Sequence, residues 1–377
     1  MAASKRNIIV GQSGGPTSVI NSSLAGVYKT AKERGFHKVY GMLHGIQGFL
    51  DEQYVDLSTQ IHSDMDIELL KRTPSAFLGS CRFKLPEIHE DTDTYEKIFQ
   101  ILDKLDIEAF IYIGGNDSMD TIKKLSDYAI IKGHSQKFLG VPKTIDNDLA
   151  LTDHTPGFGS AAKYIAASTK EVIRDALGLT YNKEMITVIE VMGRNAGWLT
   201  GATALARTEE CDGPDLIYLP EILFDMEKFE KKVTELLKKK HSIVIAVSEG
   251  IKTADGKYVC ELSGGADYVD AFGHKQLQGT AAYLAGHLGA VIGCKTRSIE
   301  FSTLQRSASH MASRVDVNEA FMVGGAAVKA ADEGDSGKMV VIDRVSDDPY
   351  MSAAGIYDVH RIANNEKLVP RTWVNKE

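Results

Sequence analysis

The feature that most constrains the fold of this chain is a repeated unit: a short apolar run, a turn rich in Gly, Asp or Pro, and an amphipathic stretch. Apolar runs without polar alternation are typical of parallel strands that are covered on both faces. We therefore expect an α/β fold with strands at residues 8–10, 39–43, 109–113, 138–141, 186–191, 216–219, 243–247 and 340–342. Helices are expected at residues 18–34, 95–105, 120–132, 161–177, 196–206, 226–239, 276–289 and 306–332.

Composition and charge narrow the classes of function. A length of 377 residues suggests two domains of ordinary size. The 43 Lys and Arg residues against 51 Asp and Glu residues give a net charge of −8, which argues against nucleic acid as a partner. The four cysteines form no C-x-x-C pair, so we expect reduced thiols. No apolar run approaches a signal-peptide core or a membrane span, and we expect a cytoplasmic protein with small-molecule substrates and no membrane partner.

Two glycine-rich loops each join an expected strand to an expected helix. The loop at residues 11–17, with Gly14 and Gly15, combines backbone that can approach a ligand closely with the free N–H groups of a helix start, which together hold phosphate. The loop at residues 114–118 contains Asn116 and Asp117, whose oxygens suit Mg²⁺ bound to phosphate. Taken alone, the first loop could be a tight turn and the second a helix cap.

The loop at residues 142–148 carries the strongest local signal. One Lys, one hydroxyl and three carboxylate or amide groups lie within six residues, directly after an expected strand. An Asp can accept the proton of an attacking hydroxyl, and a Lys can neutralise charge on a transferred phosphoryl group. This set of residues therefore suits phosphoryl transfer, with a solvated turn as the plainer alternative.

A fourth strand-to-helix loop spans residues 190–197, where Arg194 could bind a phosphate or line a sugar pocket. An isolated arginine is usually a surface residue, so the remaining polar candidates carry weight only as a set. These candidates are Arg82, Glu249, Arg297 and the segment at residues 303–306.

Six motifs, taken together and in this order, resemble the phosphofructokinase family: G-G near the N-terminus, G-G-N-D-S, P-K-T-I-D-N-D, M-G-R, S-E-G and L-Q-R. The resemblance covers about residues 6–345. It implies two Rossmann-like parallel-sheet domains with the active site in the cleft between them. We expect a donor-binding domain of residues 1–158 plus about 305–352, and a fructose-6-phosphate domain of residues 159–304 plus about 353–377.

The resemblance also implies a reaction, the Mg²⁺-dependent phosphorylation of the 1-hydroxyl of fructose 6-phosphate. Asp146 matches the general base, and Thr144 lies beside it at the transferred phosphoryl group. Donor phosphates are expected at Gly14, Gly15, Arg82, Asp117 and Lys143, and the metal at Asn116 and Asp117. Lys143, Asp117 and Thr144 are expected to take part in catalysis beside Asp146. The sugar phosphate is expected at Thr144, Ile145, Asp146, Asp148, Met192, Gly193, Arg194, Glu249, Arg297, Thr303 and Arg306.

Two positions bear on the phosphoryl donor. Members of the family that use ATP have glycine at the positions of Asp117 and Lys143. A carboxylate at position 117 would repel the α-phosphate of a nucleotide, and an ammonium at position 143 would stabilise pyrophosphate and its transition state. The pattern resembles the pyrophosphate-dependent members, so we expect pyrophosphate as the donor and a reversible reaction in glycolysis and gluconeogenesis.

Three positions depart from the family pattern. Asn116 replaces an Asp bound to Mg²⁺, and Thr303 replaces a His or Tyr of the sugar-phosphate pocket. Met185 replaces an arginine that in many members reaches the sugar phosphate of a neighbouring subunit. ATP as donor, sedoheptulose 7-phosphate as acceptor and a non-catalytic sugar-phosphate sensor stay open as alternatives. The resemblance further implies a homodimer or homotetramer.

Overall fold

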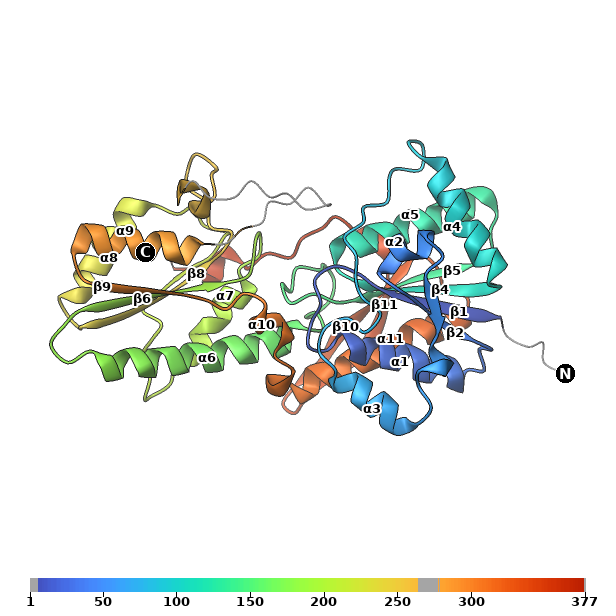
Figure 1. Cartoon of the computed structure of the whole chain (residues 1–377), viewed down its shortest axis with the longest axis horizontal. Helices are drawn as coiled ribbons and strands as arrows, with labels where there is room; N and C mark the ends of the chain where they lie inside the picture. Colours follow the sequence, from blue (N-terminus) through green and yellow to red (C-terminus); the bar gives the residue numbers. More distant parts are fainter. Residues whose placement is uncertain (1–5, 264–276, 278, 376–377) are drawn as a thin grey trace. The chain divides into compact units, whose positions relative to one another are not determined.

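The computed structural model describes residues 6–263, 277 and 279–375, and it divides the chain into two compact units (Figure 1). Unit 1 contains Met1–Ser160 and Arg306–Glu366, and unit 2 contains Ala161–Gln305 and Lys367–Glu377. The predicted α/β class is confirmed. The chain passes from one unit to the other three times, and the first two of these passages lie within two residues of the expected domain boundaries. The third lies at residue 366 instead of about 352, because residues 350–358 form a strand of the unit 1 sheet.

The sheet of unit 1 has seven strands in the order β11-β10-β5-β4-β1-β2-β3. The strands β2, β1, β4, β5 and β10 run parallel, while the edge strands β3 and β11 run antiparallel to their neighbours. Their bounds are β1 (Asn7–Gln12), β2 (Val39–Met42), β3 (Tyr54–Asp56), β4 (Ile107–Gly114), β5 (Lys137–Pro142), β10 (Lys338–Asp347) and β11 (Tyr350–Asp358).

Helices cover both faces of this sheet, which explains why its central strands are apolar throughout. Val10 and Ile111 face one helix layer, whereas their neighbours Ile9 and Phe110 face the other, as the period of two along a strand requires. The first layer consists of α1 (Ile20–Glu33), α3 (Asp64–Arg72) and α11 (Arg314–Asp332). The second consists of α2 (Gly45–Leu50), α4 (Thr92–Lys104) and α5 (Asn116–Lys132).

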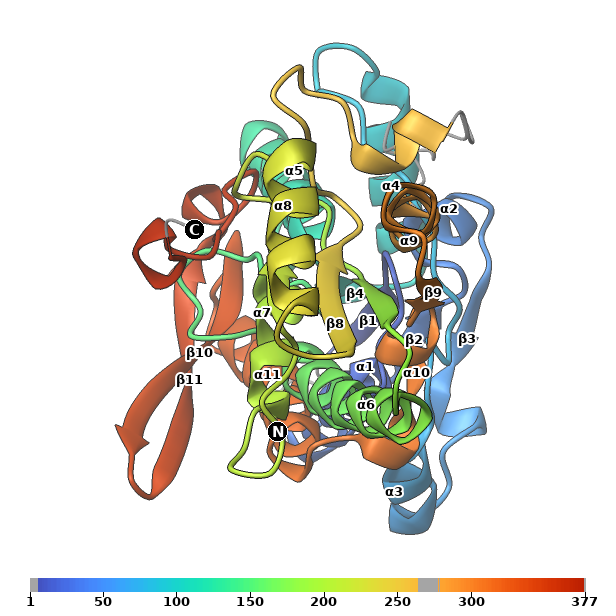
Figure 2. The ribbon, with the colours of Figure 1, turned by 90° about the vertical axis from the view of Figure 1, so that its left-hand side faces the viewer.

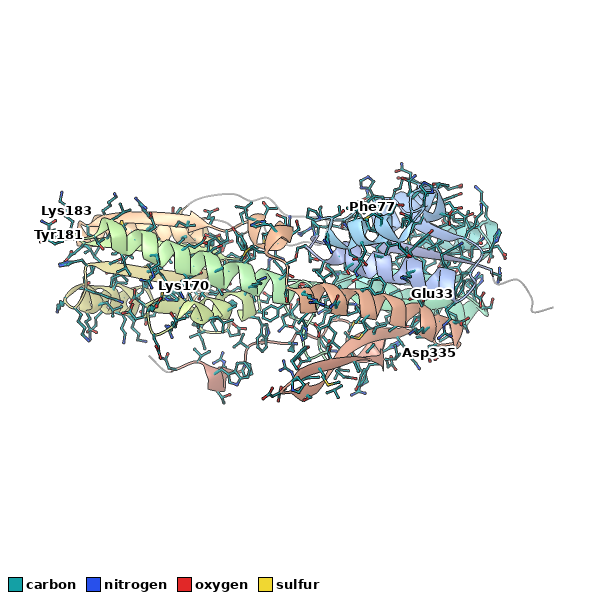
Figure 3. All side chains as sticks on the ribbon, turned by 90° about the horizontal axis from the view of Figure 1, so that it is seen from below. Glu33, Phe77, Lys170, Tyr181, Lys183 and Asp335 are labelled. Carbon is teal, nitrogen blue, oxygen red and sulfur yellow. The ribbon has the colours of Figure 1, made fainter. Side chains whose placement is uncertain are left out.

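Unit 2 has a smaller sheet in the order β7-β8-β6-β9, with all neighbours parallel. Ile186 and Val188 pack toward α8 and α9, while Thr187 between them lies toward α6, and Figure 2 shows these helices on opposite sides of the strands. Figure 3 follows α6 from Lys170 to the exposed Tyr181 beyond its end. The bounds are β6 (Met185–Val191), β7 (Leu216–Tyr218), β8 (Ser242–Ser248), β9 (Lys295–Glu300), α6 (Phe158–Leu179), α7 (Trp198–Ala202), α8 (Met226–Leu237) and α9 (Thr280–Ile292).

Several elements differ from the sequence prediction. The strands β3, β9 and β11 and the helices α2 and α3 were not predicted. The helix expected at residues 306–332 is wrong in its first turns: α10 (Leu304–Ser307) ends early, and α11 begins only at Arg314. This break lets Asp316 accept hydrogen bonds from the backbone N–H groups of Gly157 and Ser160 at the start of α6, both at 2.9 Å. The helix expected from residue 276 begins at Thr280, and residue 276 lies outside the described residues.

Across the described residues, no helix is long and apolar enough to cross a membrane.

Candidate active site

Four loops of unit 1 meet at one edge of its sheet. Because β1, β4 and β5 are parallel neighbours, the loops that follow them emerge side by side. Ser13 N–H donates to the carbonyl of Ile113, and Lys143 N–H donates to the carbonyl of Gly114, each at 2.9 Å. The segment that carries Arg82 joins them, because the Ser80 hydroxyl donates to the carbonyl of Gly14 at 2.6 Å. The structure thus brings together the predicted donor residues of unit 1.

Gly14 is required by the shape of the first loop. Its φ of +75° lies in the left-handed region, and a Cβ atom there would stand 3.1 Å from Nζ of Lys143. A Cβ on Gly15 would stand 3.0 Å from a guanidinium nitrogen of Arg306. Two cations therefore approach the glycine backbone, as a phosphate-binding loop needs.

Lys143 is the most perturbed cation of the site. Its side chain points back to the first loop, where Nζ donates to the carbonyl of Gly15 at 2.8 Å, and the residue is only 3% exposed. Burial lowers the pKa of Lys143 to about 8. The carboxylates of Asp146 and Asp148 oppose this shift, while the nearby positive charges of Arg306 and Arg82 add to it. An anion bound here would favour the charged ammonium.

The loop after β5 holds Thr144, Asp146 and Asp148 in a fixed turn. The Thr144 hydroxyl accepts from the Asp146 N–H at 3.0 Å, and the Thr155 hydroxyl donates to the Thr144 carbonyl at 2.8 Å. Burial, followed by the charge of Asp146, raises the pKa of Asp148 to about 7. Two carboxylates in one turn cannot both stay charged without cost, which is why the charge of Asp146 adds to the rise that burial causes.

Asn116 and Asp117 begin α5, directly after Gly115 as the helix cap. The loop is thus a helix start, but its cap is the glycine and not one of the side chains at residues 116–118. The amide of Asn116 is engaged at both ends: its Oδ1 accepts from the Asn364 N–H at 2.7 Å, and its Nδ2 donates to the Asn365 carbonyl at 3.2 Å. Asp117 stands in the first turn, where the helix dipole favours negative charge.

Throughout the part of the chain that the structure describes, no three His, Cys, Asp or Glu side chains converge on a common point as a metal cage would require. Magnesium commonly uses only one or two carboxylates together with substrate phosphates and water. The acidic side chains of unit 1 at Asp117, Asp146 and Asp148 fit that mode of binding.

In unit 2, the loops after β6 and β8 form a second cluster. The Ser248 hydroxyl donates to the Gly193 carbonyl, and the Glu249 N–H donates to the Val191 carbonyl at 3.0 Å. A Cβ on Gly250 would stand 1.9 Å from the carbonyl oxygen of Arg194, so these loops require glycine at this contact. The structure thus groups the predicted residues Met192, Gly193, Arg194 and Glu249.

Gln305 is a residue of this cluster that the sequence did not single out. It is buried, and its Oε1 accepts from the Met192 N–H at 3.1 Å while its Nε2 donates to the Ser302 carbonyl at 3.0 Å. It therefore ties the M-G-R loop to the segment that carries Thr303. The position of Gln305 inside the L-Q-R motif is the one feature of the sequence that could have indicated its role.

Arg297 lies apart from the other sugar-phosphate candidates of unit 2. It is in β9, in register with Thr187, which precedes Met192 by five residues, or roughly 16 Å along a strand. Its guanidinium pairs with Asp175 of α6 at 3.1 Å and lines a hollow of about 370 Å³. Within one chain, the structure thus does not bring Arg297 to the carboxyl ends of the strands.

Comparison with known proteins identifies the class of enzyme. The model of the phosphofructokinase family matches residues 7–331, and the chain belongs to this family. The predictions of that family and of a phosphotransferase are confirmed.

Two relatives and one solved structure illustrate the similarity. Pyrophosphate–fructose 6-phosphate 1-phosphotransferase of Xanthomonas campestris pv. campestris is 42% identical over 98% of this chain and 87% of its own length. A sulfofructose kinase of Alkalicoccus urumqiensis is 32% identical over 98% of this chain and 92% of its own length. The crystal structure of pyrophosphate-dependent phosphofructokinase from Nitrosospira multiformis superposes with a TM-score of 0.87 at 37% identity, over 98% of this chain and 87% of that one.

Proposed function

We propose that this protein transfers a phosphoryl group from pyrophosphate to the 1-hydroxyl of fructose 6-phosphate, giving fructose 1,6-bisphosphate and phosphate. The observation that carries the choice of donor is the buried ammonium of Lys143, which is held against the Gly15 carbonyl in the phosphate-binding loop. The Gly15 carbonyl is a neutral acceptor, and Asp146 and Asp148 offset only part of the cost of the buried charge, whereas a small polyanion would pair with it directly. The reaction is reversible and belongs to glycolysis and gluconeogenesis.

Each unit has a role in this proposal. Unit 1 binds pyrophosphate through Gly14, Gly15, Arg82 and Lys143, and unit 2 binds the sugar phosphate through Met192, Gly193, Arg194, Glu249 and Thr303. Arg306, which the family resemblance assigns to the sugar phosphate, lies beside Gly15 in unit 1 and is suited to a phosphate oxygen there. Ile145 is buried in the same turn as Asp146.

In the reaction, Asp146 accepts the proton of the 1-hydroxyl as that oxygen bonds to phosphorus and the phosphoanhydride bond breaks. Lys143 and Arg82 stabilise the negative charge on the transferred group and on the departing phosphate. The Thr144 hydroxyl orders the backbone at Asp146. Magnesium, held by Asp117 together with the pyrophosphate oxygens, would neutralise further phosphate charge.

A steady-state assay tests donor and acceptor together. Fructose 6-phosphate and Mg²⁺ are supplied with either pyrophosphate or ATP, and turnover with pyrophosphate alone is expected. Turnover with ATP alone would overturn the donor assignment. The double substitution of Asp117→Gly with Lys143→Gly is expected to abolish pyrophosphate use and to allow some use of ATP, with Lys97→Gly as the control at an exposed lysine. Parallel reactions with sedoheptulose 7-phosphate and a sulfonated fructose test the acceptor.

We further propose that the enzyme acts in the cytoplasm as a homodimer or homotetramer. Arg297 lines an open hollow on α6 and β9, far along the strands from Met192. Met185, at the position where many members carry an arginine for the neighbouring subunit, is in register with Lys295, two residues from Arg297. Arg297 is therefore suited to the sugar phosphate of a second copy. Light scattering coupled to size exclusion measures the assembly, and a fully active monomer would contradict this proposal.

A further inference from the structure

The chain returns from unit 1 to unit 2 between Glu366 and Lys367. We call residues 364–371 the strap. Each end of the strap is fastened, within its own unit, to one of the loops that the proposed function assigns to a substrate. The fastening groups are Asn116, which the sequence placed at the metal, and Glu221 and Trp198, which the sequence did not single out.

In unit 1, the strap is held at the loop that begins α5. The two bonds of the Asn116 amide hold the backbone of Asn364 and Asn365, and the Asn364 side chain donates to Asp120 at 3.0 Å. Asn364 has a φ of +63°, a left-handed conformation that asparagine adopts more readily than most residues. Further along, Glu366 forms an antiparallel bridge with Leu149, the residue after Asp148.

An asparagine suits this position better than the aspartate of most family members. The bond to Asn364 needs an acceptor, and the bond to Asn365 needs a donor, so an amide satisfies both. Aspartate would keep the first bond but would set a carboxylate against the Asn365 carbonyl. The departure from the family pattern at Asn116 is thereby explained by the strap.

In unit 2, the strap is held at the loop that carries the M-G-R motif. One oxygen of Glu221, Oε1, accepts from both the Gly197 N–H and the Val369 N–H, each at 2.9 Å. The Trp198 indole donates to the Lys367 carbonyl at 2.8 Å, and its ring meets that of Trp373 edge to face. Gly197 ends the loop and Trp198 begins α7, so loop and strap share their anchoring groups.

We propose that Asn116 and Glu221 are positioning residues that fasten the two ends of the strap, so that the strap couples the order of the Asn116 loop to that of the Met192–Gly197 loop. Only Glu366 separates Asn365, which is held in unit 1, from Lys367, which is held in unit 2. A loss of backbone order at one end of the strap therefore reaches the other end over very few residues. In this arrangement Asn116 acts through the strap and is not a ligand of magnesium.

Hydrogen–deuterium exchange of the full-length protein without substrates tests the coupling independently of activity. In Asn116→Ala we expect the Asn364 amide to exchange about tenfold faster, and the amides of Gly197 and Val369 in unit 2 to accelerate as well. Glu221→Ala, which removes the acceptor shared by Gly197 and Val369, should accelerate exchange of the Val369 amide and, through the strap, of the Asn364 amide. The control is Asn182→Ala, at an exposed asparagine of unit 2, which should change none of these amides. Acceleration confined to the unit that carries the substitution would overturn the proposal.

A kinetic measurement separates positioning from metal binding, and it rests on the proposed function. Asn116→Asp, which retains the size of the side chain, is expected to raise KM for fructose 6-phosphate about tenfold with the Mg²⁺ concentration for half-activation unchanged. A lower Mg²⁺ requirement with an unchanged KM would instead identify residue 116 as a metal ligand and refute its positioning role. If the wild-type protein fails to use pyrophosphate, the proposed function falls, and the exchange experiment still decides the coupling.

Discussion

Replacing Lys143 with methionine is expected to stabilise the substrate-free protein while abolishing its turnover. The pKa of Lys143 falls from 10.5 to about 8 on folding because the ammonium is buried. At about pH 7 this shift corresponds to roughly 3 kcal/mol of lost folding free energy. Methionine avoids that cost but loses the hydrogen bond to Gly15, which is worth about 1 kcal/mol. A net gain of about 2 kcal/mol in the free energy of unfolding is therefore expected for Lys143→Met.

The sign of this effect follows from proton linkage. Between about pH 8 and pH 10.5 the unfolded chain binds a proton at Lys143 that the folded protein has released, so raising the pH stabilises the wild-type protein relative to the variant. At about pH 9.5 the electrostatic cost is only about 1.4 kcal/mol, and the advantage of the variant should nearly vanish. The pH dependence thus distinguishes relief of a buried charge from ordinary repacking.

Urea unfolding in the absence of phosphate, pyrophosphate and Mg²⁺ measures the effect. Both tryptophans, Trp198 and Trp373, belong to unit 2, so their emission follows that unit while far-ultraviolet circular dichroism follows both. The midpoint should move in the dichroism of Lys143→Met and not in its tryptophan emission. Lys97→Met, at an exposed lysine of α4, is the control. A variant no more stable than the wild type at about pH 7, or equally favoured at both pH values, would contradict the electrostatic explanation.

Three further substitutions probe other parts of unit 1. Asp146→Asn is expected to reduce kcat by about 10² to 10⁴, and an unchanged kcat would remove Asp146 from the role of base. Gly14→Ala places a Cβ 3.1 Å from Nζ of Lys143 at a φ of +75°, so it should cost about 1–2 kcal/mol in urea unfolding and raise KM for pyrophosphate. His154 resists charging because it is buried, but hydrogen bonds to Glu319 and Asp153 outweigh this and raise its pKa above 6.5. The stability that protonated His154 adds is present below about pH 6.5 and is lost as the pH rises through the raised pKa. His154→Gln should therefore lose more stability near pH 6 than near pH 8.5. An equal loss at both pH values would show that the charge of His154 does not contribute.

Strands that are covered by helices on both faces could be predicted from the sequence. The strands β3, β9 and β11, each of which lies at an edge of its sheet, could not. β1, β4 and β5 are apolar throughout because helices cover both of their faces, and their residues identify them directly. β9 reads Lys-Thr-Arg-Ser-Ile-Glu, since it is an exposed edge strand held by its ladder with β6. The hairpin of β10 and β11 likewise has largely exposed outer residues, which explains the misplaced third crossing.

The site residues divide in the same way. The loops at residues 11–17, 114–118 and 142–148 follow adjacent parallel strands, so sheet topology brings them together and sequence order was enough to group them. Arg297 was grouped with Met192 by motif order alone, but motif order does not fix position along a strand, and the register places it elsewhere. The contacts of Asn116 with residues 364 and 365 could not be predicted, because they join segments about 250 residues apart without any pattern in either.

The three positive charges that lie close together in unit 1, those of Lys143, Arg82 and Arg306, are suited to binding an anion. A protein that needed Lys143 solely for its fold would gain by burying methionine there, since Asp146 and Asp148 offset only part of the cost of burying an ammonium. Arg82 and Arg306 increase that cost, because they add positive charge around the same point. A polyanion with several charges on few atoms reverses the balance, since it pairs with all three cations at once. The cost of burying Lys143 in the substrate-free protein and the proposed selectivity for a compact donor therefore have one physical origin.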